Sequence, residues 1–171
     1  MSIMSKMTAA YLAGFVDGEG YISLKRDSHD YRGEKVIYFT AVLKIANTNQ
    51  EIIEWCKSSF GGWIYLKTPK NGENWKDAYC WQLTGPNLEP LLIKLLPYLR
   101  IKKEQARLVL KKIKNQKLGE LPYKNISQIN EQRVEKMDRN SDYRIKIRKE
   151  NEDIYWKLRE LNKKGLCSVN D

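Results

Sequence analysis

The chain has 171 residues, with 31 Lys and Arg against 21 Asp and Glu, so its formal net charge is +10 and its isoelectric point is near 9.4. This length suits one domain with a sizeable core, and the positive charge favours a polyanionic partner, nucleic acid before an acidic membrane. No apolar run reaches the roughly 20 residues that span a bilayer, and three widely spaced cysteines without a Cys-x-x-Cys pair argue against a zinc site or a disulfide framework.

Residues 12–20 combine small residues with large apolar ones and contain two carboxylates. At helical spacing, small residues and one acid form a stripe that another backbone could approach closely: Ala10, Ala13, Gly14 and Asp17. Gly18 and Gly20 are predicted to end the helix, which leaves Glu19 on a turn at its C-terminal end. A carboxylate there faces the negative end of the helix dipole, so its position favours a bound cation.

Two strands are predicted next, because polar and apolar residues alternate over residues 21–27 and 38–45. The polar segment between them, residues 28–35, contains the single histidine and is predicted to be a loop. Residues 48–51 (Thr-Asn-Gln-Glu) fit a capping box, and they begin a short helix that ends at a pair of glycines.

Two further strands are predicted at residues 63–67 and 79–84, with an Asn-Gly turn in the segment between them. A leucine-rich helix follows, bounded by Pro86 and Pro97. The next helix, residues 103–114, is expected to turn its basic residues outward: Arg107, Lys111 and Lys112.

The predicted order is helix, two strands, helix, two strands and further helices, which is an α+β pattern. Together with residues 12–20, this order closely resembles the LAGLIDADG homing endonucleases, although Phe15, Val16, Gly18 and Glu19 depart from the eponymous string. The resemblance implies an αββαββα fold whose four-stranded antiparallel sheet lies as a saddle on DNA, followed by C-terminal helices.

The resemblance is good over residues of about 8–115 and looser over about 116–171, where residues 153–165 look like the family's closing helix. We therefore expect a single endonuclease domain over residues 1–171, with a core followed by a C-terminal helical and basic segment.

A site-specific DNA endonuclease is the function that the resemblance implies: a metal-dependent phosphodiester hydrolase of the intron-homing kind. Its cofactor would be Mg²⁺, with other divalent cations such as Mn²⁺ as alternatives. Glu19 would bind the metal together with the Gly18 carbonyl, Lys102 matches a lysine that stabilises developing charge, and Asn47 matches a residue that positions water. The other readings stay open: Lys102 as a surface lysine at a helix start, and Asn47 as a helix N-cap.

The acid-bearing motif occurs once, whereas cleavage of two strands requires two sites, so we expect a homodimer that packs through the small-residue stripe. The exposed faces of the strands would lie in the major groove of double-stranded DNA. Strands of about nine residues, rising about 3.3 Å each, would cover about nine base pairs, so a dimer would read a near-palindromic site of about twenty. The expected DNA-facing residues on the strands are Lys25, Tyr38, Thr40, Lys44, Trp63, Tyr65, Lys67 and Gln82.

A basic stretch between two predicted helical segments suits phosphate contacts and comprises Arg139, Arg144, Lys146, Arg148 and Lys149.

Two alternatives share this fold: an intron RNA maturase that assists splicing, and a DNA-binding protein that does not cleave. A binding protein alone has no need for clustered acids, whereas the sequence says little against a maturase. We expect an intracellular protein without a membrane partner. The composition is rich in Lys, Asn, Ile and Tyr, which is typical of proteins encoded by an AT-rich genome, such as that of a chloroplast or mitochondrion.

Overall fold

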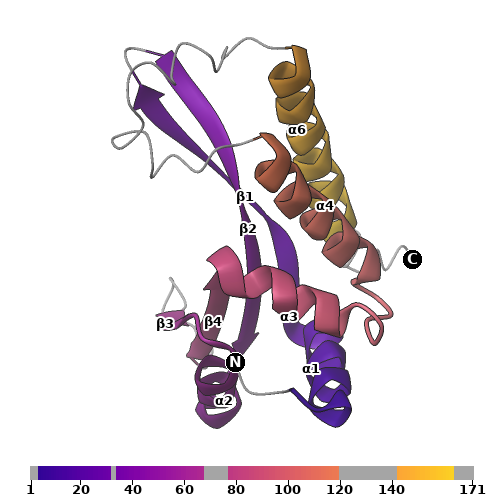
Figure 1. Ribbon diagram of the computed structural model, residues 1–171. Helices are drawn as coiled ribbons and strands as arrows, with labels where there is room; N and C mark the ends of the chain where they lie inside the picture. The colour runs from indigo at the N-terminus through magenta and orange to yellow at the C-terminus, as the bar shows by residue number, and fades with distance from the viewer. Residues whose placement is uncertain (1–3, 32–33, 68–76, 120–141, 164–171) are drawn as a thin grey trace, which may run out of the picture.

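Helices pack against one face of a four-stranded antiparallel sheet, which confirms the predicted α+β architecture (Figure 1). The computed structural model describes residues 4–31, 34–67, 77–119 and 142–163. Its elements are α1 (Lys6–Glu19), β1 (Gly20–Tyr31), β2 (Glu34–Asn47), α2 (Gln50–Phe60), β3 (Trp63–Lys67), β4 (Ala78–Thr84), the 3-10 turn η1 (Gly85–Asn87), α3 (Leu88–Leu95), α4 (Lys103–Gly119) and α6 (Asp142–Lys163).

The strand order is β1-β2-β4-β3, and every neighbouring pair is antiparallel. β4 pairs with β2 only over Val42–Asn47, so beyond that point β1 and β2 continue as a two-stranded ribbon. The prediction of a loop at residues 28–35 was wrong for residues 28–31 and 34–35, because the strands stay paired as far as Tyr31 and Glu34; residues 32–33 lie outside the described residues. At the far end of the ribbon the side chains do not alternate between polar and apolar, so the sequence pattern does not indicate a strand there. Backbone hydrogen bonds between β1 and β2 nevertheless extend both strands.

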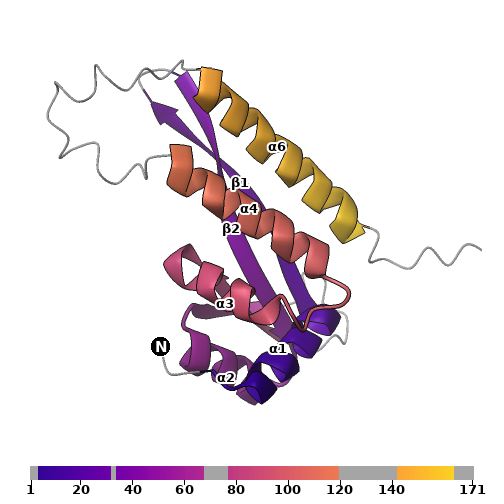
Figure 2. The same cartoon turned by 45° about the vertical axis from the view of Figure 1, so that its right-hand side comes forward.

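The core lies between the sheet and its helices. Apolar strand residues are buried, including Ile22, Leu43, Trp81 and Leu83, and they pack with Leu12 and Val16 of α1 and with the leucines of α3. α4 and α6 run side by side along the β1–β2 ribbon in both views (Figures 1 and 2). Phe39 of β2 meets Tyr155 of α6, with ring centroids 5.2 Å apart, so α6 closes the core over the ribbon.

The junction between α1 and β1 has no loop. α1 continues through Gly18 to Glu19, so the prediction that Gly18 ends the helix was wrong. The chain turns at Gly20, whose N–H donates to the Val16 carbonyl. A Cβ at Gly20 would lie 2.5 Å from that carbonyl oxygen, so the close approach of the backbone requires glycine here.

Side chains from the helices satisfy backbone carbonyls on both open edges of the ribbon. Lys112 of α4 is fully buried and donates from Nζ to the Phe39 carbonyl, on the edge of β2 that β4 does not reach. Asn162 of α6 donates to the Ile22 carbonyl of β1 at 3.1 Å. The prediction that Lys112 points outward was therefore wrong. A buried carbonyl on an unpaired sheet edge requires a hydrogen-bond donor, and the Lys112 ammonium supplies it.

The last helix is longer than predicted and begins at Asp142, so Lys146 and Arg148 lie on α6 rather than between two helices. Arg139 lies outside the described residues, and the side chain of Arg144 is not among those described. None of the helices in the described ranges is both long and apolar enough to cross a membrane.

Replacing Lys112 with Ala is expected to lower the free energy of unfolding by about 1–3 kcal/mol, because it leaves the buried Phe39 carbonyl without its donor. Urea titration followed by circular dichroism measures this change. Lys114→Ala is the matched control, since Lys114 is exposed on the same helix. Equal stabilities of the two variants would contradict the role of Lys112.

Candidate active site

The C-terminal end of α1 brings an exposed acid to the edge of the sheet. Glu19 is the last residue of the helix, and β1 begins at the next residue. The last turn of α1 contains no basic residue, so the helix itself supplies no positive charge against the negative end of its dipole. A nearby cation, from elsewhere in the chain or bound from solution, would therefore stabilise Glu19.

Asp17, two residues earlier, anchors the segment that leads into α4. Its two carboxylate oxygens accept the backbone N–H groups of Arg100 at 2.7 Å and of Lys102 at 2.9 Å. The Lys102 ammonium also donates to the Asp17 main-chain carbonyl, one of the last carbonyls of α1. Asp17 therefore holds Lys102 against the acidic end of the helix across 85 positions of sequence.

Lys102 is half-buried, and burial lowers its pKa below the ordinary value of 10.5. The charges of Asp17 and then Glu19 oppose that shift, which shows that both acids are close enough to stabilise the ammonium. The structure thus brings together Glu19 and Lys102, which sequence resemblance had paired. The alternative reading of Lys102 as a surface lysine at a helix start does not account for these contacts.

The donor set around Glu19 consists of oxygen atoms. Gly18 lies in the last turn of the helix, where carbonyl groups lack intrahelical partners, and the Glu19 carboxylate follows it. Such ligands suit Mg²⁺, which keeps part of its water shell and also takes phosphate oxygens. Within the described residues no three His, Cys, Asp or Glu side chains gather into a metal site. In the described part of the chain, Glu19 is thus the acidic side chain at this point, with backbone carbonyls beside it.

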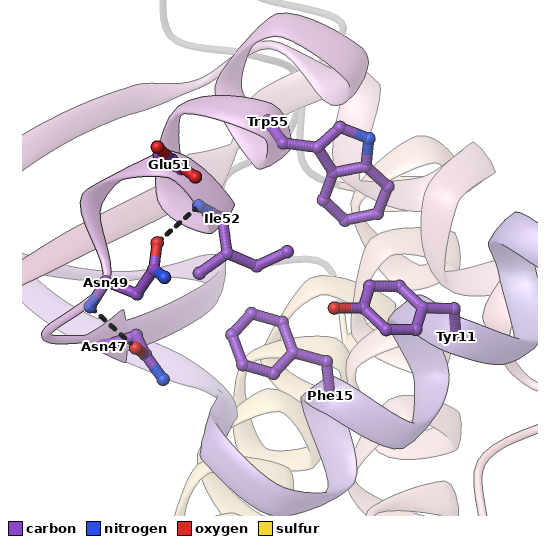
Figure 3. Close-up of a pocket in the computed structure, with 7 residues that line it drawn as sticks. All are labelled: Tyr11, Phe15, Asn47, Asn49, Glu51, Ile52 and Trp55. Carbon is purple, nitrogen blue, oxygen red and sulfur yellow. Dashed lines mark hydrogen bonds between the residues drawn. The ribbon is translucent and has the colours of Figure 1, made fainter.

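Asn47 is the last residue of β2. Its side-chain oxygen accepts the N–H of Asn49 at 2.8 Å, and Asn49 in turn accepts the N–H of Ile52 at 3.2 Å (Figure 3). Asn49 is thus the N-cap of α2, and the alternative reading of Asn47 as the cap was wrong. Asn47 also lines an open pocket of about 480 Å³ between α1 and α2, with Phe15 and Trp55 among its other walls.

The pleat of the sheet places all eight predicted strand residues on one face. Directly opposed residues share a face, so Tyr21, Lys44, Gln82 and Trp63 form one row across four strands. Lys25 and Thr40 pair in a second row, Tyr38 opposes Asp27, Tyr65 opposes Cys80, and Lys67 opposes Ala78. We call this surface, opposite to the one that packs on the core helices, the open face.

Several aromatic side chains on the open face are accessible: Tyr38 and Trp63 are 44% exposed and Tyr65 is 38% exposed. A hydrogen bond with Cys80, and burial after it, raise the pKa of Tyr65 to about 12, so its hydroxyl stays protonated at neutral pH. Tyr21, 43% exposed, was missed as a candidate although the alternation of its strand had placed it with Lys25.

The basic residues of α6 do not join this surface. α6 packs on the covered side of the ribbon, where Ile154 and Leu158 enter the core, whereas Lys146 and Arg148 are exposed on the same helix. They stand apart from the strand residues, and any contact they make with DNA would be separate from the open face.

The predicted stripe on α1 is only partly accessible. Ala13 is fully buried in the core, so assigning it to an interface between subunits was wrong. Ala10 and Gly14 are exposed, and with the half-buried Asp17 they line a shallow groove against Pro97–Arg100. A Cβ at Gly14 or at Gly18 would meet nothing within 4 Å, so the backbone of α1 is open to approach along this line.

The fold is similar to several solved structures of homing endonucleases. I-CvuI in complex with its target in the presence of Ca is 23% identical, with a TM-score of 0.54, and the match covers 92% of this chain and 96% of that one. The archaeal intron-encoded endonuclease I-Vdi141I complexed with DNA is 16% identical, covered at 91% and 97%, with a TM-score of 0.52. The LAGLIDADG homing endonuclease I-GzeII in complex with its DNA target is 14% identical, with a TM-score of 0.56, covering 86% of this chain and 43% of that one.

No sequence-family model matches the chain. At these identities the likeness establishes the architecture, so the chain has the fold of the LAGLIDADG homing endonucleases.

Asp17→Asn is expected to lower the pKa of Lys102 further, because it removes the acid whose charge has the larger effect on the ammonium. Glu19→Gln should lower it by less, since its charge has the smaller effect. Titration of Lys102 by ¹³C NMR of its side-chain methylene next to Nζ measures both shifts. A rise of the pKa in either variant would contradict the described electrostatics.

Proposed function

We propose that this protein is a homodimeric, divalent-metal-dependent, site-specific DNA endonuclease of the intron-homing kind. One observation carries the proposal: the open face of the sheet ends at the junction of α1 and β1, where exposed Glu19 ends the helix whose Asp17 carbonyl accepts a hydrogen bond from the Lys102 ammonium. A surface suited to duplex DNA therefore leads directly to groups suited to phosphodiester hydrolysis.

DNA recognition is the role that we propose for the open face. A two-stranded ribbon fits the major groove, where each base pair presents a distinct pattern of donors and acceptors. The row of Tyr21, Lys44, Gln82 and Trp63 supplies donors, acceptors and aromatic surface, and the net charge of +10 favours the phosphate backbone.

Hydrolysis would use oxygen ligands from α1 and the Lys102 ammonium. Glu19 would hold Mg²⁺, with the Gly18 carbonyl beside it, and the bound ion would supply an activated water and neutralise phosphate charge. Lys102, fixed through Asp17, would stabilise negative charge that develops on the phosphate. The Asn47 amide nitrogen would orient water, because its oxygen is already engaged by the N–H of Asn49.

Dimerisation would complete the site. Ala10, Gly14 and Gly18 present a low ridge on α1, and the open space over the two glycines lets a second α1 approach closely. Exposed apolar side chains flank this ridge, with Met7 at 81% and Tyr11 at 58%. A two-fold axis along this ridge would bring two Glu19 residues together, and their mutual repulsion would favour divalent cations between them.

The solved structures support the same reading. I-CvuI was crystallised with DNA in the presence of Ca and, in another structure, Mg, and both matches cover nearly its whole length. I-Vdi141I and I-GzeII were likewise solved with DNA.

Glu19→Gln is expected to bind duplex DNA and to fail to nick it, because the amide keeps the size of the side chain but loses the anionic ligand. The test incubates a plasmid library with random inserts and Mg²⁺, and counts nicked and linear molecules. Glu54→Gln, an exposed acid on α2, is the matched control and should cleave like the wild type. Full activity of Glu19→Gln, or wild-type cleavage that persists in EDTA, would contradict the site. DNA binding without cleavage by the wild type would favour a non-cleaving protein or a maturase.

Gly14→Leu is expected to disrupt the dimer without unfolding the subunit, since the added side chain meets open space within one chain. Leucine also has a higher helix propensity than glycine by about 1 kcal/mol, so the subunit should be at least as stable. Sedimentation velocity with and without duplex DNA measures the change in mass. Lys94→Leu on the exposed side of α3 is the control for added apolar surface. A wild-type protein that binds duplex as a single subunit would contradict the dimer.

A further inference from the structure

An acid lies on the open face within the strand that begins at the proposed active site. On β1 the residues of this face are Tyr21, Ser23, Lys25, Asp27 and His29. A carboxylate repels phosphate and so weakens general attraction to DNA. Its presence on a surface that would otherwise attract any duplex calls for a specific role.

Asp27 forms an ion pair with Lys25, the neighbouring residue on the same face. The distance from Lys25 Nζ to Asp27 Oδ1 is 2.9 Å, and the side chains are 65% and 25% exposed. The hydrogen bond to Asp27, followed by the attraction of its charge, raises the pKa of Lys25. Thr40 and Tyr38 lie directly opposite the two residues on β2, so the pair sits within a defined part of the face.

The pair changes what Lys25 can recognise. A lone lysine on this face would bind any phosphate, which adds affinity without sequence information. Held beside Asp27, the ammonium is a donor placed next to an acceptor. Guanine N7 and O6 are adjacent acceptors that one ammonium can contact together, and the N4 amino group of the paired cytosine lies beyond them as a donor for the carboxylate. In an A·T pair the donor, adenine N6, separates the two acceptors, so the G·C pair offers the better match.

We propose that Asp27 is a specificity-determining residue that, together with Lys25, selects a G·C base pair within the target DNA. The inference rests on the proposed function and adds to it a base preference and the residue that imposes it. Asp27 also lowers the affinity for unrelated duplex, because its charge cancels that of Lys25 toward phosphate.

The test measures binding of the full-length protein to a random duplex library in EDTA, followed by sequencing of the bound fraction. The wild type should enrich one G·C pair in each half-site, and Asp27→Asn should reduce that preference by about tenfold. The same variant should bind unrelated duplex more tightly, with a salt dependence steeper by about 0.9 in the log–log slope for each released Lys25.

Asp30→Asn is the matched control, because Asp30 is an exposed acid on the same strand whose position in the pleat is on the other face. It makes the same change of charge and should leave the base preference unchanged. An unaltered preference in Asp27→Asn, an equal loss in Asp30→Asn, or enrichment of an A·T pair at the Asp27-dependent position would overturn this inference alone. A wild type with no sequence preference would overturn both it and the proposed target specificity.

Discussion

The hydrogen bonds from Arg100 and Lys102 to the Asp17 carboxylate hold the two halves of the site together. They join the end of the first helix to a segment that lies beyond the whole sheet in sequence, so the Lys102 ammonium comes to rest against the last turn of α1. The close turn at Gly20 then starts β1 without a loop. Because each step leaves little freedom, the acid, the lysine and the first strand of the open face have fixed relative positions before any ligand binds.

The pleat of the sheet places different kinds of side chain on its two faces. One face carries Ile22, Leu43, Trp81 and the other core residues, while the open face carries the polar and aromatic rows. β1 and β2 extend beyond the end of β4, which leaves backbone groups on an open edge. Lys112 and Asn162, from the helices, donate hydrogen bonds to two of the ribbon's carbonyl groups. The helices thereby support a long ribbon on whose open face Tyr21 and Tyr38 stay exposed.

Sequence periodicity predicted what depends on local pattern and missed what depends on tertiary partners. The prediction that Trp63 lies on the exposed face of its strand was right, because a half-buried strand has a period of two and Trp63 is 44% exposed. The prediction that Lys112 points outward was wrong, because the local sequence does not indicate that a carbonyl on the edge of a distant strand requires a donor. Ala13 was wrongly assigned to an interface because a small residue suits a core as well as a contact between subunits. The meeting of Glu19 and Lys102 came from family resemblance, because no spacing rule links residues so far apart.

One subunit supplies half of the proposed chemistry, and this constrains the kind of DNA that it can read. Each chain offers one Glu19 next to one open face, so two strand cleavages require two faces related by a two-fold axis. The half-sites of the target must then be near-repeats in inverted orientation, with the scissile bonds close to the axis. Lys25, the member of the Lys25–Asp27 ion pair nearer to the proposed active site, lies five residues beyond Gly20 along β1. The base pair that this ion pair prefers would therefore lie outside the cleaved centre, once on each side of the two-fold axis. The proposed recognition and cleavage sites thus occupy separate parts of one continuous surface.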